Sequence, residues 1–404
     1  MHILYIHQYF ATPLGCTGTR SYEFARRWVA KKHKVTMLTT TAQLTCEDLA
    51  EAKGRFIKKY AVSGINVLAL AIPYRQQMGM FKRCLAFCVF SSLASVAAFF
   101  LKFDVLYVTS TPITVGIPAL IARWFRRKKF IFEVRDQWPA AMVKMGFLKN
   151  RFLIGISTCL EKVIYKYSAA IVTVSDGMAE GVKEIAGETK LIYVIPNGAD
   201  LDFFRPDIAN DEIRRKNQWN SKFVLLYAGA IGRINGLDLI IDVAEKLKNH
   251  KSILFVLVGK GSNKGILENR VEKLGLTNVQ ILPSVPKQKL AGLFSASDVI
   301  MATISNFPSV EQSASLNKFY DGLSAGKPVL LNYYGWQGKL LEDNHAGFGC
   351  KLYDVDEFAE KVLYLSSHPE QVTEMGRNAR RLAVERFDRD KLAAQALEIV
   401  SGLR

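Results

Sequence analysis

The chain has 404 residues, of which 49% are hydrophobic and 23% are charged. This length suits two domains of about 200 residues each rather than one core. The composition is that of a globular protein and excludes a disordered chain, a repeat array or a fibre.

The formal net charge of +17 is unevenly distributed. Residues 1–200 carry 27 Lys and Arg against 13 Asp and Glu, an excess of 14, whereas residues 201–404 carry 27 against 24, an excess of 3. We therefore expect the first half to meet a polyanion, namely an anionic membrane face or a pyrophosphate-lipid, in preference to a nucleic acid. The six cysteines form no C-x-x-C pair, and the first residues begin a strand. These features predict a cytoplasmic protein without a secretory leader or a structural metal.

The first elements predict a doubly wound α/β domain. Residues 3–7 and 34–39 are apolar and typical of strands, and residues 21–30 between them are typical of a helix. In the first loop, Gly18 lets the backbone approach a phosphate or sugar, and Arg20 supplies a cation. The alternative is a tight turn with a surface arginine. A G-x-G-x-x-G fingerprint is absent, which argues against a dinucleotide cofactor.

A stretch of eighteen uncharged residues covers 84–101 and is long enough to be a borderline membrane span. Residues 103–109 read as the next strand of the same sheet, so a span would separate that strand from its neighbours. We therefore predict a helix packed on the sheet. Lys82, Arg83 and the basic run 123–129 lie nearby in sequence. Two interpretations remain open: an apolar face that enters a membrane interface, or a wholly buried core helix.

The segment after the predicted strand 129–134 carries side chains suited to catalysis, because loops at the carboxyl ends of strands hold the chemistry of open α/β sheets. Asp136 can accept the proton of an attacking hydroxyl. Arg135 can hold an anionic group, and Trp138 can stack on a sugar. The alternative is that Asp136 caps a helix that has Pro139 in its first turn.

A second doubly wound domain follows the turn P-N-G-A-D at 196–200, where we place the hinge. The first domain is therefore 1–197 and the second is 198–385. The last helix, about 386–404, is expected to cross back to the first domain. In the second domain, the predicted strand 223–228 restarts the alternation of strands and helices.

Glycines and a cation follow the strands of this second domain. Gly232 and Arg233 lie in its first loop, where they suit the wrapping and neutralising of a pyrophosphate. Gly261 follows the next strand, and Leu282 ends a later one. The alternative for the first loop is a solvated hairpin-like loop.

The stretch 313–330 predicts a helix that ends at Gly326 and leads into a buried strand. Asn317, Lys318 and Asp321 project from its first turns. The N-terminus of such a helix can bind a diphosphate with the help of Lys318, and a carboxylate one turn later can hold a ribose diol. The alternative is an ordinary amphipathic helix with a solvated face.

Four motifs resemble the family 4 glycosyltransferases, in particular the subgroup that builds O-antigen, capsule and colanic acid and includes N-acetyl-fucosamine transferases. They are S-A-S-L-N-K-F-Y-D-G-L-S-A-G-K-P, P-L-G-C-T-G-T-R, I-P-N-G-A-D-L-D-F-F-R-P and R-D-Q-W-P, the last similar to a D-L-W-P signature with Gln137 in place of Leu. The resemblance covers nearly the whole chain. It implies the GT-B architecture, two Rossmann-like domains that face each other across a cleft.

The resemblance also implies an activity and a set of site residues. The activity is metal-independent, retaining transfer of a sugar from a nucleoside diphosphate, such as a UDP-linked N-acetyl-deoxyhexosamine, to a polyprenyl-diphosphate-linked or glycan acceptor at the inner membrane face, without a cofactor. The implied catalytic residues are Asp136 and Arg233, and the acceptor contacts are Arg135 and Trp138. The donor contacts are Gly18, Arg20, Gly232, Gly261, Leu282, Asn317, Lys318 and Asp321.

The sequence departs from the family at further positions, one of which is Asp321, a shorter carboxylate where the family has its second glutamate. The family has a glutamate where Ser313 lies, and an arginine and a lysine where Ala230 and Asn235 lie. Arg233 is the candidate substitute cation. Two other functions share the predicted architecture: a UDP-sugar 2-epimerase, which would use acidic and histidine groups, and a non-catalytic nucleotide-sugar binding subunit.

Overall fold

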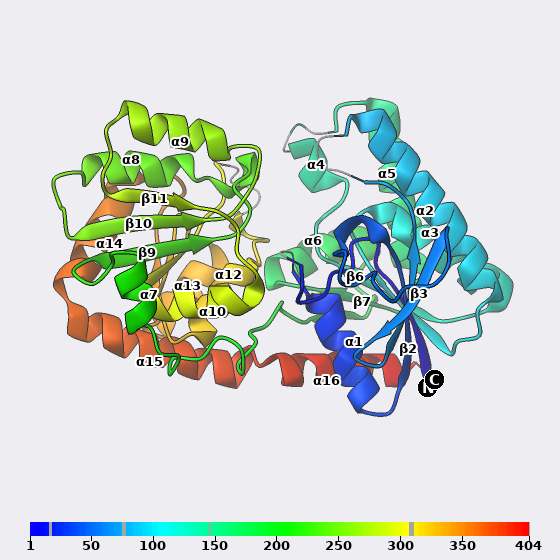
Figure 1. The fold of residues 1–404 in the computed structure, drawn as a ribbon. Coiled ribbons are helices and arrows are strands. Elements are labelled where there is room, and N and C mark those ends of the chain that lie inside the picture. Colours follow the sequence, from blue (N-terminus) through cyan, green and yellow to red (C-terminus); the bar gives the residue numbers. More distant parts are fainter. Residues whose placement is uncertain (16–17, 75–77, 145, 147, 307–310, 404) are drawn as a thin grey trace. The chain divides into compact units, whose positions relative to one another are not determined.

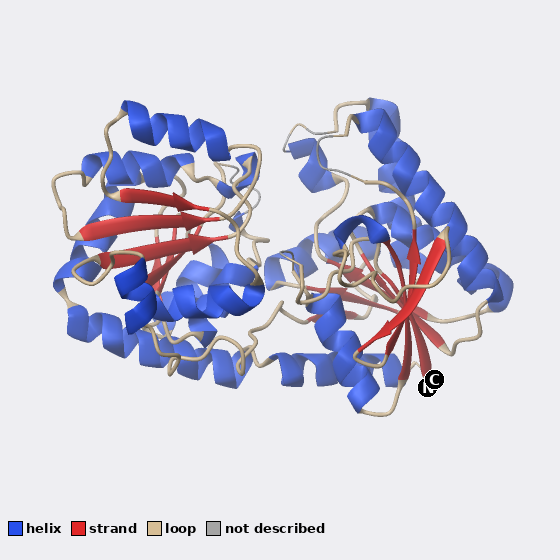
Figure 2. Ribbon diagram, in the orientation of Figure 1, coloured by secondary structure: helices blue, strands red, loops and turns tan. Residues whose placement is uncertain are grey.

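The structure is a computed structural model that describes residues 1–15, 18–74, 78–144, 146, 148–306 and 311–403. It divides into two compact units. Unit 1 contains Met1–Pro196 and Asp390–Arg404, and unit 2 contains Asn197–Arg389. Each has a central sheet with helices on both faces, as Figures 1 and 2 show. The prediction of two doubly wound α/β domains is confirmed.

Unit 1 is built on an eight-stranded sheet with the order β3-β4-β2-β1-β5-β6-β7-β8. Neighbouring strands are parallel, except that β3 and β4 form an antiparallel hairpin. In the central register, Ile3 of β1 pairs with Val35 of β2 and with Val105 of β5. The strands are β1 (His2–Ile6), β2 (Lys34–Thr40), β3 (Ile57–Val62), β4 (Ile65–Leu70), β5 (Val105–Thr109), β6 (Phe130–Val134), β7 (Ala170–Thr173) and β8 (Ile192–Val194).

The central strands of this sheet are buried on both faces, which is why their sequences are nearly continuous apolar runs. The hairpin of β3 and β4 is not among the predicted strands. Its turn residues Ser63 and Gly64 both have positive φ, 49° and 76°, as a tight hairpin turn requires.

The helices of unit 1 cover both faces of the sheet. The C-terminal helix α16 packs on unit 1, where Trp28 donates its indole N–H to the carbonyl of Ala393 at 2.9 Å. The helices are α1 (Arg20–Ala30), α2 (Met80–Phe100), α3 (Gly116–Arg126), α4 (Ala140–Lys144), α5 (Arg151–Tyr167), α6 (Asp176–Ala186) and α16 (Arg389–Ser401), with short 3-10 helices η1 (Thr41–Gln43) and η2 (Ile113–Val115).

Unit 2 is built on a six-stranded parallel sheet with the order β11-β10-β9-β12-β13-β14. Its strands are β9 (Phe223–Ala228), β10 (Ile253–Val258), β11 (Val279–Leu282), β12 (Val299–Ala302), β13 (Val329–Leu331) and β14 (Gly347–Gly349). Its helices are α7 (Asp211–Lys216), η3 (Arg233–Asn235), α8 (Asp238–Lys246), α9 (Lys264–Lys273), α10 (Lys287–Ala296), α12 (Asn317–Ser324), α13 (Gly335–Asp343), α14 (Val355–Ser367) and α15 (Pro369–Arg386).

Each sheet reverses its winding direction at one point, and ligands of open α/β sheets bind outside the carboxyl ends of the strands at such points. In unit 1 the chain first moves from β1 to β2 and β4, and then returns to β5 on the other side of β1. In unit 2 it moves from β9 to β10 and β11, and then returns to β12 on the other side of β9. The carboxyl ends of β1 and β5, and of β9 and β12, are therefore the expected locations of sites.

Candidate active site

The helix α12 has the form that the sequence predicts. It begins at Asn317, and Phe319, Tyr320 and Leu323 are buried. Gly326 follows in the left-handed conformation with φ of 65°, and β13 comes directly after. The residue before the helix is Leu316, whose side chain cannot accept a hydrogen bond from the first backbone N–H groups. The helix N-terminus thus has free donors suited to an anion.

Lys318 joins this helix to the first loop of unit 2. Its ammonium lies 4.6 Å from the centre of the Tyr227 ring, at the end of β9. The Tyr227 hydroxyl donates to the carbonyl of Ala230 at 2.7 Å and so orders the loop. Burial lowers the pKa of Lys318 to about 8, against the opposing effect of Asp321. The side chain therefore remains mostly a cation at neutral pH and is only partly hydrated.

Asp321 lies one turn farther along α12 and is half-buried. Burial raises the pKa of its carboxyl to about 6, although Lys287 and Arg389 oppose the increase. Among the residues that the structure describes, none donates a hydrogen bond to this carboxylate. Asp321 is therefore mostly ionised at pH 7 and has acceptor oxygens available for a ligand.

Arg233 lies on η3 in the loop after β9, with an exposed side chain. Within the described part of the chain it forms no ion pair or hydrogen bond. Gly232 precedes it in an extended conformation with φ of −121°. The alternative of a hairpin-like loop is not what forms, because the loop leads through η3 into α8. Arg233 is free to meet an anion near the carboxyl end of β9.

Gly261 and Leu282 lie in the neighbouring loops of unit 2. A Cβ on Gly261 would approach the carbonyl oxygen of Ile231 to 2.1 Å, so this glycine is needed for packing between the loops after β9 and β10. The carbonyl of Leu282, at the end of β11, accepts the N–H of Gly259 at 3.2 Å. This packing explains why position 261 needs a glycine even without a bound ligand. That Gly261 and Leu282 contact the donor stays a prediction.

In unit 1, Asp136 and Arg135 lie just beyond the carboxyl end of β6. The exposed Asp136 carboxylate accepts the Thr111 hydroxyl at 2.5 Å instead of capping the next helix. The backbone N–H of Arg135 donates to the Ser110 hydroxyl at 2.9 Å. These bonds bring the segment after β6 against the segment after β5, next to the reversal point of the sheet. Asp136 is thus held in place and remains accessible.

Trp138 packs its ring against the core of unit 1. Its indole N–H is buried and has no partner among the described residues. A buried polar group without a partner is unusual and often marks a position for a ligand or water. The predicted acceptor contact of Trp138 therefore depends on the indole edge more than on the ring face, which is already partly covered.

Arg20 is the clearest departure from the sequence-based prediction. The residue is 2% exposed. Nε donates to Glu133 at 3.0 Å, Nη2 donates to the carbonyl of Ile195 at 2.8 Å, and Nη1 donates to that of Pro196. All three nitrogens are thus used inside unit 1, so neither a donor contact nor a surface arginine fits. We assign Arg20 a structural role.

Gly18 and Ser313 belong to segments that the structure describes in part. Gly18 is exposed two residues before α1, and its neighbours 16–17 lie outside the described residues. Ser313 stands where the family has a glutamate. The nearby Glu311 accepts the backbone N–H groups of Tyr334 and Gly335 at 2.9 and 3.1 Å and so caps α13. Its carboxylate is therefore already engaged.

The sequence-based prediction missed a group of charges next to α12. The Asp200 carboxylate lies 3.2 Å from the Lys287 ammonium and 3.4 Å from the Arg389 guanidinium. The signal in the sequence was the acid of the P-N-G-A-D turn, but nothing indicated its partners, which are 87 and 189 residues away.

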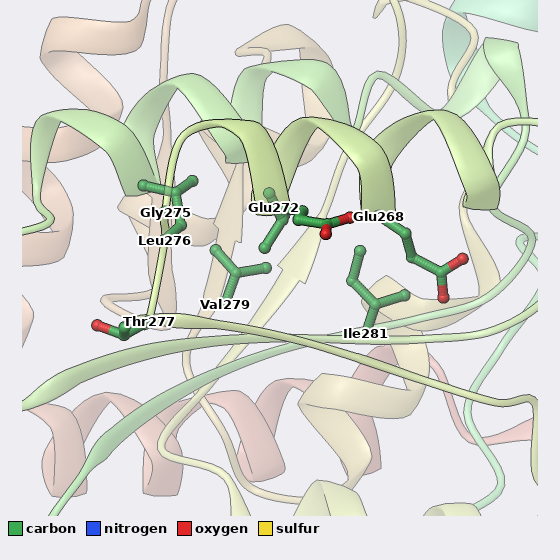
Figure 3. Close-up of a pocket in the computed structure, with 8 residues that line it drawn as sticks. Glu268, Glu272, Gly275, Leu276, Thr277, Val279 and Ile281 are labelled. Carbon is green, nitrogen blue, oxygen red and sulfur yellow. The ribbon is translucent and has the colours of Figure 1, made fainter.

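An open groove of about 450 Å³ lies elsewhere in unit 2, between α9 and the edge strand β11 (Figure 3). Glu268 and Glu272 line it from the helix, and Val279 and Ile281 line it from the strand. It contains none of the predicted site residues. Within the described ranges, no group of three or more His, Cys, Asp or Glu side chains is arranged to hold a metal ion.

Comparison with known proteins shows which families the two units resemble. Residues 15–198 match the family "Glycosyl transferase 4-like domain", and residues 209–382 match "Glycosyl transferases group 1". Spore coat protein SA of Bacillus subtilis is 22% identical over 68% of this chain and 76% of its own length. The putative colanic acid biosynthesis glycosyl transferase WcaI of Escherichia coli is 25% identical over 42% of each chain.

The fold also matches solved structures. HepE of Anabaena, in complex with UDP-glucose, superposes with a TM-score of 0.75 at 17% identity and covers all of both chains. This similarity extends to both units, and the two family matches together span most of the sequence. The chain is thus a glycosyltransferase with the GT-B fold, in which residues 15–198 match the 4-like domain and residues 209–382 match the group 1 domain.

Proposed function

We propose that this protein transfers a sugar from a UDP-linked donor to a lipid-linked or glycan hydroxyl in bacterial surface polysaccharide synthesis. The observation that carries the proposal is the start of α12, where free backbone donors, the partly buried Lys318 and the unbonded carboxylate of Asp321 occur within two turns. This combination suits a diphosphate joined to a ribose. The relative named for colanic acid biosynthesis supports the polysaccharide role, and the UDP-glucose complex of HepE supports the choice of nucleotide.

The described cations would stabilise the leaving diphosphate. As the glycosidic bond breaks, negative charge grows on the diphosphate, and donors that are already in place stabilise that charge most. Lys318 is held over Tyr227, and the N-terminus of α12 adds backbone N–H groups. Arg233 adds an exposed cation in the loop after β9. We extend the proposal to metal independence and to retention of anomeric configuration, as the family resemblance implies.

The acceptor would bind in unit 1 next to β5 and β6. Asp136 is an exposed carboxylate anchored by Thr111, so it can accept the proton of an attacking hydroxyl. Arg135 can pair with an acceptor phosphate, and the free indole N–H of Trp138 can donate to a sugar hydroxyl. Asp136 and Arg233 are thus the proposed catalytic residues of the two units.

Unit 1 also has a surface suited to a membrane. The buried face of α2 consists of Ala86, Phe90, Ala94 and Ala98, which pack in the core. The opposite face of α2, with neighbouring side chains on α3 and α5, is apolar and exposed; we call it the apolar helix surface. It comprises Phe81, Leu85, Val89, Leu93, Val96, Phe99 and Phe100 of α2, Trp124 and Phe125 of α3, and Phe152, Leu153 and Ile156 of α5.

The helix α3 contacts both α2 and α5, and Figure 1 shows the three helices together along unit 1. The rings of Phe99 and Phe125 join α2 to α3, and those of Trp124 and Tyr167 join α3 to α5. The sequences of α2 and α3 contain no Asp or Glu, and the one acid of α5, Glu161, is buried. Apolar side chains among basic ones favour an anionic lipid interface.

The helix α2 is long and apolar enough to cross a membrane by length and composition, and 33% of its apolar eighteen-residue window is buried. Its two ends lead to β4 and β5 of one sheet, however, and Arg126 donates to the carbonyls of Ala98 and Leu101 at its C-terminus. A spanning helix would have to break these contacts. We therefore propose that the protein lies peripherally on the cytoplasmic face, with α2 in the plane of the interface.

A panel of nucleotide sugars tests the function. UDP and UDP sugars should raise the melting temperature of the full chain more than ADP or GDP sugars do. Mass spectrometry should then show transfer to a polyprenyl-diphosphate-linked glycan, or slow release of UDP by hydrolysis. Interconversion of the UDP sugar without release of UDP would identify an epimerase instead. Binding without hydrolysis or transfer to any acceptor would favour the non-catalytic subunit.

A further inference from the structure

The two chain segments that border unit 2 lie side by side within it. Ala199 and Asp388 form a parallel β-bridge. The N–H of Ala199 donates to the carbonyl of Phe387 at 2.7 Å, and the N–H of Arg389 donates to that of Ala199 at 3.3 Å. The first and last residues of the unit are therefore held together by main-chain bonds.

We call the two bridged segments, around Ala199 and Asp388, the junction. An ion cluster made of Asp200, Lys287 and Arg389 stabilises it. One carboxylate oxygen of Asp200 lies 3.2 Å from the Lys287 ammonium and 3.4 Å from the Arg389 guanidinium. Arg389 also donates to the carbonyl of Gly198 at 3.0 Å. Asp200 and Arg389 are 7% and 5% exposed. Charges this deeply buried are costly unless they are paired, so the cluster is a specific feature of the unit.

The junction packs directly against the donor helix α12. The hydroxyl of Ser324 donates to the carbonyls of Asp200 and Phe204 at 3.1 and 2.8 Å. The ring of Phe387 contacts that of Tyr320, with 5.1 Å between the centroids. Ser324 lies three residues after Asp321 and therefore on the same side of the helix. The face of α12 that holds Asp321 is the face that meets the junction.

Charged groups from every element around this face act on Asp321. They are Asp200 from the segment after β8, Lys287 from α10, Arg389 from the start of α16, and Lys318 from α12 itself. Arg380 of α15 donates to the carbonyl of Ser324 nearby. Burial raises the pKa of Asp321 to about 6; Lys287, Arg389 and Lys318 oppose this increase, and Asp200 adds to it.

We propose that Asp200, Lys287 and Arg389 are positioning residues for the donor site: together they fix α12 on the junction, and the two cations, Lys287 and Arg389, keep the Asp321 carboxylate charged for the ribose hydroxyls. The inference rests on the proposed function, because the ribose contact belongs to the UDP-linked donor. Lys287 and Asp200 have opposite effects on the pKa of the Asp321 carboxyl, because the cation lowers it and the anion raises it.

The test is UDP affinity as a function of pH, measured by calorimetry on the full chain. Binding that needs an ionised Asp321 is strong above the pKa and weakens as pH falls through it, so Kd at pH 5.5 should be about four times that at pH 7.5. Lys287→Met should move the midpoint upward by about half to one pH unit, and Asp200→Asn should move it downward. Lys287→Arg should restore the midpoint of the parent.

Two controls isolate the effect. The terminal phosphate of UDP itself has a pKa of about 6. This contribution is common to all variants and cancels when their midpoints are compared. The exposed Lys289 on the same helix provides Lys289→Met, which should leave the midpoint unchanged. The shifts should become smaller with 2′-deoxy-UDP, because one of the two ribose hydroxyls that contact Asp321 is then missing.

Different failures have different meanings. If UDP does not bind the parent chain, the proposed donor class is wrong, and this inference is wrong with it. If UDP binds but Lys287→Met and Lys287→Arg share the midpoint of the parent, only the positioning role is overturned. Midpoint shifts of the same sign for Lys287→Met and Asp200→Asn, or unchanged shifts with 2′-deoxy-UDP, would also overturn it. If Asp200→Asn fails to fold, the two Lys287 variants still decide.

Discussion

The first loop of each unit carries an arginine behind glycines, and the two arginines differ in burial and in the bonds that they form. Arg20 in unit 1 is 2% exposed and bonded through three nitrogens to Glu133 and to two carbonyls. Arg233 in unit 2 is exposed and forms no ion pair or hydrogen bond within the described part of the chain. The same sequence feature thus serves folding in one unit and is available for binding in the other.

The distribution of charge shows the same contrast. Unit 1 presents its basic side chains around an exposed apolar surface, whereas unit 2 gathers Asp200, Lys287 and Arg389 into a buried cluster beside α12. Exposed charges act at long range and are screened by salt, but buried charges act on one neighbour and are hardly screened. We therefore expect unit 1 to determine where the protein binds, and unit 2 to determine which nucleotide it binds.

The largest expected effect is on the stability of unit 1. Arg20→Met leaves Glu133 buried without its cation, which should cost about 3–5 kcal/mol of unfolding free energy. The pKa of Glu133 is raised by burial but more strongly lowered by Arg20, Arg135, Thr109 and Tyr107, and the net result is below its ordinary value of 4.5. The stabilisation is therefore present at neutral pH and lost as pH falls below about 4.5 toward the lowered value.

Urea denaturation of the full chain measures this loss. The double variant Arg20→Met/Glu133→Gln should recover part of it, because no unpaired charge remains buried. UDP affinity of the folded fraction should equal that of the parent. A reduced affinity with unchanged stability would return Arg20 to the donor site.

In unit 2, Asp321→Ala should weaken UDP binding by about 1.5–3 kcal/mol, the cost of losing hydrogen bonds to a charged group. The protein should remain folded, because the carboxylate has no hydrogen-bonded partner among the described residues. Calorimetry with UDP measures the change, and UMP provides a check that retains the ribose. Equal UDP affinity in the variant and the parent would contradict the ribose contact.

Asp321 and Arg20 show what could and could not be predicted from the sequence. The position of Asp321 follows from local information, since helical spacing, the glycine stop and the following strand all lie within twenty residues. The burial of Arg20 depends on Glu133, which is 113 residues away, and on the carbonyls of the two residues that follow β8. Sequence patterns describe which face of an element is apolar, but they do not indicate which distant polar group a buried cation will meet.

Some strands could be predicted from the sequence and others could not. Long apolar strands in the centre of each sheet were predicted within a few residues, because burial on both faces leaves a continuous apolar run. The hairpin of β3 and β4 was missed. In β3, exposed and partly buried residues alternate at the edge of the sheet, so its apolar signal is weak. The partners of Asp200 were missed because ion pairs between distant residues leave no periodic pattern.

Arg233→Met tests the other arginine and should affect donor kinetics without affecting stability. We expect kcat/KM for the donor to fall about tenfold, which corresponds to about 1.4 kcal/mol, because the cation interacts more strongly with the diphosphate as the bond breaks. Steady-state kinetics measure the change, and Lys260→Met offers a matched loss of an exposed cation in the neighbouring loop. Parent-like kinetics in the Arg233 variant would remove this residue from the site.

The smallest effect per residue is expected at the membrane. Each basic side chain near an anionic surface contributes about 1 kcal/mol, and the attraction fades as salt shortens the Debye length from about 10 Å at 0.1 M to about 3 Å at 1 M. Vesicles with anionic lipid should therefore bind the protein more tightly than neutral vesicles. Reversing the charge of the exposed Lys82, Arg123, Arg127 and Arg151 should weaken binding while UDP affinity stays unchanged. Arg126 is unsuitable for this purpose because it caps α2.

The matched control reverses four exposed lysines of unit 2: Lys248, Lys251, Lys273 and Lys289. It changes the net charge equally, so a purely global electrostatic effect would weaken vesicle binding as much as the unit 1 variant does. We expect the control to retain most of its binding, because only unit 1 combines basic residues with the apolar helix surface. Flotation that is equal for neutral and anionic vesicles, or equal losses in the two variants, would show that the basic half of the chain serves another polyanion.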